Sequence, residues 1–89
     1  MGWQPELFDA GQKRLEFRVC QVQQARVTFV NGEWAGAVAM DPSRAEAALA
    51  SCPQEWDYLD QAGRDGWDLA AVIPGAAPDV RMVYLRRER

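Results

Sequence analysis

The segment Pro53–Pro74 most constrains what this chain can fold into, because it combines a helical pattern, a glycine stop and a buried strand. Pro53 suits the first turn of a helix, where its missing N–H and fixed φ cost nothing. Gly66 suits the left-handed residue that ends a helix. We therefore predict a helix over Pro53–Asp65, followed directly by a strand.

The predicted helix has one apolar face that would pack on a sheet. This face follows the i, i+3, i+6, i+7 spacing and consists of Trp56, Leu59, Ala62 and Gly63. A glycine inside a helix costs about 1 kcal/mol relative to alanine, so Gly63 predicts a close approach of helix to sheet. Trp56 and Trp67 are both predicted to be core residues.

Further strands flank this unit. Alternating apolar residues predict strands over Leu15–Val22 and Val80–Leu85. Asn31-Gly32 favours a two-residue hairpin between Val27–Val30 and a strand that starts at Glu33. Asp41 can cap a short alanine-rich helix. The predicted fold class is α+β, an antiparallel sheet of four to five strands with one main helix packed on one face. Residues 1–13 are expected to be an N-terminal arm, and residues 14–89 a single α+β domain.

The two faces of the predicted sheet are both apolar. We expect the helix to cover the face that carries Phe17, Leu69, Ile73, Met82 and Tyr84. The opposite face would then present Cys20, Val22, Ala70, Val72, Val83 and Leu85, which is too apolar for a surface open to water. The N-terminal arm, the alanine-rich segment or a second copy of the chain must cover it. A homo-oligomer is expected, because isologous dimers are the commonest solution.

Catalytic groups are scarce in this sequence. It contains no histidine, which removes the commonest general base and metal ligand. Cys52, near the start of the predicted helix, could have a lowered pKa, but no base accompanies it. Asp57 and Asp60 share one helix face, as solvated carboxylates do. We therefore predict no enzyme activity, no catalytic residue, no cofactor and no metal site.

The N-terminal arm carries too many large apolar side chains for a purely solvated segment. Its Gln4-Pro5-Glu6-Leu7-Phe8 segment resembles the Gln-x-x-Leu-Phe peptide with which bacterial replication and repair proteins dock on the sliding clamp. Pro5 departs from the favoured leucine of that peptide. The resemblance implies an adaptor that binds a partner protein through the arm.

Charge and composition limit which other classes of partner the protein can have. The net charge of −3 argues against nucleic acid as a partner, although the chain ends Arg86-Arg87-Glu88-Arg89. No apolar run approaches the roughly 20 residues of a membrane span. Cys20 and Cys52 are far apart and outside any CxxC motif, which is typical of reduced thiols in a cytoplasmic protein.

The segment Trp56–Leu69 resembles the signature of DUF4177, a small bacterial family of unknown function. The Gly63/Gly66/Trp67 spacing matches the family core, while Asp60 stands where the family has asparagine. The resemblance covers about Leu15–Arg87 and implies an α+β fold without an assigned activity. The segment Asp41–Cys52 is longer than that family pattern.

The function predicted from the sequence is a non-enzymatic protein-interaction module that self-associates through a sheet face. The alternatives are the adaptor that docks through its arm and a small-molecule binder with a pocket between Trp34, Tyr58 and the sheet. The expected partner-binding residues are Trp3, Gln4, Leu7, Phe8, Trp34, Val72, Val83 and Leu85.

Overall fold

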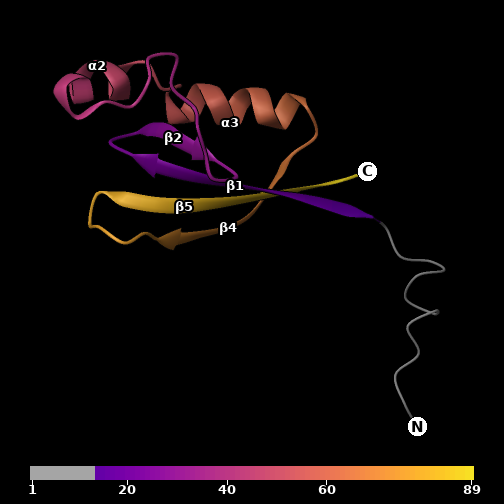
Figure 1. The fold of residues 1–89 in the computed structure, drawn as a ribbon. Coiled ribbons are helices and arrows are strands. Elements are labelled where there is room, and N and C mark those ends of the chain that lie inside the picture. The colour runs from indigo at the N-terminus through magenta and orange to yellow at the C-terminus, as the bar shows by residue number, and fades with distance from the viewer. Residues whose placement is uncertain (1–13) are drawn as a thin grey trace, which may run out of the picture.

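Five antiparallel strands and one principal helix make up residues 14–89, the part of the chain that the computed structural model describes (Figure 1). The strands are β1 (Leu15–Gln23), β2 (Arg26–Val30), β3 (Glu33–Trp34), β4 (Asp68–Pro74) and β5 (Val80–Glu88). Their order in the sheet is β3-β2-β1-β5-β4. The helical elements are η1 (Pro42–Arg44), α2 (Ala45–Ala50) and α3 (Glu55–Arg64). The predicted α+β fold class is confirmed.

The hairpin turn between β2 and β3 lies where the sequence predicts it. Asn31 has a φ of 50° and Gly32 a φ of 82°, the left-handed values that a type I′ turn requires. The Asn31 side chain also accepts a hydrogen bond from the backbone N–H of Val19, at 2.8 Å. The turn is therefore tied to β1 as well as to its own hairpin.

Helix α3 begins two residues later than predicted, because the backbone at Pro53 is hydrogen-bonded to β2. The Pro53 carbonyl accepts a hydrogen bond from the Val27 N–H at 2.9 Å, and the Glu55 N–H donates to the Ala25 carbonyl at 2.8 Å. Gln54, with extended backbone, is the N-cap residue. These bonds join the start of α3 to β2 and fix the rotation of the helix about its axis.

This rotation places Leu59 and Ala62 of the predicted face against the sheet, with Tyr58 in place of Trp56. Tyr58, Leu59 and Ala62 pack on the core, whereas Trp56 is 68% exposed. The prediction of Trp56 as a core residue is therefore wrong. The close approach predicted at Gly63 is also wrong, because a Cβ there would meet no atom within 4 Å.

The Gly63→Ala variant is expected to be more stable than the wild type by about 1 kcal/mol. Alanine gains helix propensity, and its methyl group meets no neighbour at this position. Gly66→Ala is the matched control: φ is +94° at Gly66, so alanine there is strained and the variant should lose stability. Urea denaturation measures both changes, and a loss of stability in Gly63→Ala would contradict this packing.

The face of the sheet that α3 covers is the reverse of the predicted one. The buried core contains Cys20, Val22, Val27, Ala62, Trp67, Val83 and Leu85. In the β1–β5 register Cys20 lies beside Val83, and Val19 beside Tyr84 on the other face. The small side chains of Cys20, Val22 and Val83 leave room for a helix, which gives a physical reason for this orientation.

Candidate protein-interaction surface

Strand β4 forms one edge of the sheet and is exposed along its whole length. It pairs with β5 alone among the described residues, and Figure 1 shows it at the edge away from α3. All seven of its residues are exposed, including Leu69, Val72 and Ile73. An edge strand presents a row of backbone N–H and C=O groups that can pair with another strand. β4 combines this edge with apolar side chains on both faces.

The opposite edge of the sheet is much shorter. β3 has only two residues, and the chain beyond it stays attached to β2 through the Ala35 N–H, which donates to the Thr28 carbonyl at 2.8 Å. The Trp34 indole N–H donates to the Val38 carbonyl at 2.8 Å. This edge therefore offers little backbone for pairing, and β4 is the longer edge among residues 14–89.

The sheet face opposite α3 carries a second group of apolar side chains, which we call the open-face patch. Strand alternation and register place its members on that face: Leu15, Phe17, Val19, Ile73, Met82 and Tyr84. Phe17 is 58% exposed, and Val19, Met82 and Tyr84 are half-buried. Ile73 belongs to β4, so the patch is continuous with the exposed edge strand.

On the α3 side, the indole of Trp67 packs against two arginines. The Arg18 and Arg87 guanidinium carbons lie 4.4 and 4.5 Å from the ring centroid. These distances suit cation–π attraction, which is stronger where water is excluded. Arg18 also donates to the Tyr58 hydroxyl at 2.9 Å and so ties β1 to α3.

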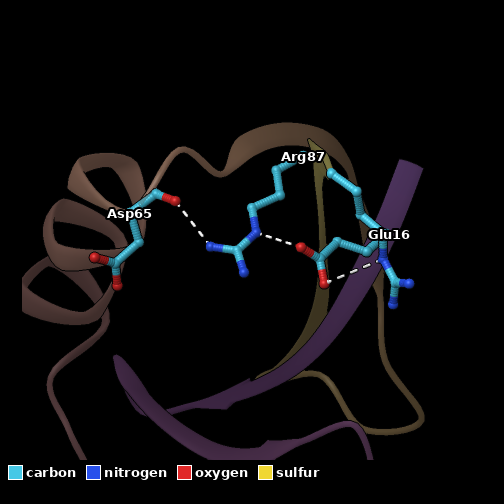
Figure 2. Close-up of polar contacts among 4 residues, drawn as sticks. Glu16, Asp65 and Arg87 are labelled. Carbon is cyan, nitrogen blue, oxygen red and sulfur yellow. Dashed lines mark hydrogen bonds and ion pairs between the residues drawn. The ribbon is translucent and has the colours of Figure 1, made fainter. Parts of the chain in front are cut away.

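Arg87 links the end of α3 to the two long strands (Figure 2). Its guanidinium donates to the Asp65 carbonyl at 2.8 Å and to the Glu16 carboxylate at 2.5 Å. Arg89 lies 3.8 Å from the other oxygen of Glu16. Part of the basic C-terminal sequence therefore has a structural role.

The ion pair between Glu16 and Arg87 predicts an acid dependence of stability. The hydrogen bond from Arg87 lowers the pKa of Glu16 from its ordinary value of 4.5. A carboxyl whose pKa is lower in the folded state stabilises the fold above its unfolded pKa, and this contribution is lost as the pH falls through the folded pKa. In Glu16→Gln, urea denaturation should show a shallower fall in stability below about pH 4.5 than in the wild type.

Glu33→Gln, at an exposed position on β3, controls for the loss of one negative charge. Identical pH dependence in the wild type and Glu16→Gln would contradict a stabilising role for the Glu16–Arg87 pair.

The two cysteines are unsuited to nucleophilic chemistry. Both are buried and unpaired. Burial raises the pKa of Cys20 and of Cys52, so both thiols stay protonated near neutral pH. Cys52 lies just after α2, where its thiol contacts the Ala48 carbonyl at 3.6 Å, and it precedes the N-cap of α3. The lowered pKa considered from the sequence is therefore wrong.

The residues predicted to bind partners do not form one surface in the structure. Val72 is exposed on β4, and Trp34 is half-buried beside Phe29. Val72, Val83 and Leu85 were expected on the face opposite the helix. That prediction is wrong, because Val83 and Leu85 are buried beneath α3 and Val72 pairs with Val83 on the same face. Trp3, Gln4, Leu7 and Phe8 lie outside the described residues, as does the predicted sliding-clamp peptide.

Sequence reasoning missed the binding potential of Phe17, Met82 and Tyr84, which it placed beneath the helix. The positions of the arginines in the sequence could have indicated which face of the sheet α3 covers. Arg18, Arg81 and Arg87 share one face of β1 and β5, and each bonds to α3 or its C-cap, through Tyr58, Glu55 and Asp65. Arginine has an apolar stem and a charged head, so it can line the rim of a buried face.

Three observations complete the description of possible sites. Within residues 14–89, no group of three or more His, Cys, Asp or Glu side chains could hold a metal ion. No helix in this part of the chain has the length and apolar character to cross a membrane. Comparisons with protein-family models, curated proteins and solved structures gave no match, so the resemblance to DUF4177 stays a prediction.

Proposed function

We propose that this protein is a non-enzymatic interaction module that self-associates through the open-face patch and the β4 edge. The observation that supports it most is β4, a seven-residue apolar edge strand exposed at every position. Long apolar edges are uncommon on monomers, because they pair with other chains. The proposed setting is the cytoplasm, where the unpaired Cys20 and Cys52 would stay reduced.

The proposal retains self-association from the sequence prediction but changes the residues that mediate it. Val83 and Leu85 support the core, and the contacting set becomes Phe17, Ile73 and their neighbours on the open face, with Val72 on the α3 side of the β4 edge. An isologous contact fits this surface, because the same patch and edge on two copies can cover each other.

Sedimentation velocity over a range of protein concentrations tests the proposal. The wild type should sediment as an oligomer whose fraction rises with concentration, and Phe17→Lys should shift it to monomer. Trp56→Lys is the matched control, because Trp56 is a large exposed apolar residue on α3, outside the proposed surface. A wild-type monomer at high micromolar concentration, or equal effects of the two variants, would refute the proposal.

A further inference from the structure

A cleft of about 560 Å³ lies between the β2–β3 hairpin and the segment that carries η1 and α2. Phe29 and Trp34 line it from the sheet, and Met40, Asp41 and Glu46 line it from the other side. Its volume is in the range of small-molecule sites, roughly 300–1,000 Å³. The sequence predicted a pocket between Trp34 and Tyr58, but Tyr58 is absent from this lining and bonds to Arg18 instead.

The aromatic wall of the cleft is held in a fixed orientation. The rings of Phe29 and Trp34 meet edge to face, with centroids 5.4 Å apart. The Trp34 indole N–H is bonded to Val38, and its ring lies so close to Gly36 that a Cβ there would come within 2.7 Å of the indole nitrogen. Fixed aromatic faces attract cations through their negative quadrupole.

The charged residues that line the cleft, among those the structure describes, are both acidic. Among residues 14–89, Asp41 and Glu46 are the only ionisable residues that line it. One Asp41 oxygen, Oδ1, accepts hydrogen bonds from the Ser43 N–H and hydroxyl, at 3.1 and 3.0 Å. The other oxygen makes no hydrogen bond within residues 14–89, and neither does the exposed Glu46 carboxylate.

We propose that this cleft binds an organic cation, an ammonium group carried on an apolar or methylated body. The carboxylates would attract the charge, and the aromatic pair with Met40 would contact the apolar part. The same carboxylates would repel an anion. The cleft shares no lining residue with the open-face patch or β4, so this inference does not depend on self-association.

Titration with benzyltrimethylammonium, followed by ¹H–¹⁵N NMR, tests the proposal. We expect saturable shifts of the Phe29 and Trp34 amides and of α2, and at least about fivefold weaker binding of neutral benzyl alcohol. A parallel titration with N-acetyl-lysine N-methylamide distinguishes the two sources of such a cation. Binding of this compound would support a protein lysine as the ligand, and binding of benzyltrimethylammonium alone would support a small quaternary ammonium compound.

The variant Asp41→Asn/Glu46→Gln keeps the shape of the cleft and the Asp41 cap geometry while removing both charges. We expect it to bind benzyltrimethylammonium about fivefold more weakly than the wild type, or worse. Glu33→Gln is the control: Glu33 neighbours Trp34 but does not line the cleft, so binding should be unchanged. Absent shifts at Phe29 and Trp34, or equal affinity of the double variant and the wild type, would overturn the proposal.

Discussion

The Trp67→Ala variant is expected to lose about 3–5 kcal/mol of unfolding free energy, which is the largest effect that we predict for a single side chain. Trp67 is only 7% exposed and lies within the core cluster under α3. Its removal would leave a cavity and would also deprive Arg18 and Arg87 of the ring on which they stack. Since a domain of this size has about 5–15 kcal/mol of stability, the variant would be close to unfolding.

Trp56→Ala provides the matched comparison, because it removes the same side chain from the exposed surface of α3. Its indole N–H donates to the Gln54 side-chain oxygen at 3.2 Å, an exposed contact on the surface of α3. The change in unfolding free energy should be within about 0.5 kcal/mol. Urea denaturation followed by far-UV circular dichroism measures both variants. Similar losses in the two would mean that α3 is rotated differently on the sheet.

The second large effect is expected at Leu85, which lies beside Leu69 in the register between β4 and β5. Leu85 is 3% exposed and Leu69 is 60% exposed, although both are leucines on neighbouring strands. Leu85→Ala should cost about 2–5 kcal/mol, because it opens a cavity under α3. Leu69→Ala should change the stability of the monomer little, because solvent already surrounds that side chain.

This pair tests how far α3 extends across its own face of the sheet, because directly paired residues point to the same face. If α3 covered β4 as well as β5, Leu69→Ala and Leu85→Ala would cost similar amounts of unfolding free energy. The measurement is the unfolding free energy at a protein concentration low enough to keep the chain monomeric. A loss in Leu69→Ala as large as that in Leu85→Ala would contradict the observed packing.

The sequence predicted the elements well, because their signals are local. Asn31-Gly32 defines its own turn, and Gly66 ends α3 through its positive φ. Asp41 caps the 3-10 turn before α2, as its short side chain and the following proline suggest. Each of these signals is complete within a few residues, so no tertiary information was needed.

Apolar alternation alone could not predict the choice of sheet face, because both faces of β5 are apolar. Met82 and Tyr84 alternate with Val83 and Leu85, and this alternation is consistent with either orientation. Long-range contacts decide between them. The bonds that join Pro53 and Glu55 to the β1–β2 hairpin set the rotation of α3, and Arg81 then pairs with Glu55. Apolar periodicity does not encode these contacts; the arginines that share one face of β1 and β5 are the one signal of them in the sequence.

The sequence predicted part of the candidate surface and missed the rest, because it assigned α3 to the wrong face of the sheet. The sequence indicated that one sheet face is too apolar to remain uncovered, and Val72 does lie exposed on β4. Because the predicted face was wrong, the sequence assigned Val83 and Leu85 to the binding surface. Phe17 and Tyr84 were assigned to the core instead. The cleft beside α2 depends on how the loop after β3 folds back over Phe29, which no periodicity encodes.

Hydrogen exchange of the β4 amides at two protein concentrations tests self-association most directly, because exchange reports on each backbone N–H separately. If β4 is the contact, its outward-facing amides should exchange quickly in dilute solution and become protected in concentrated solution, while the amides of β1 stay protected in both. Equal exchange of β4 at high micromolar and low micromolar concentrations would contradict the account.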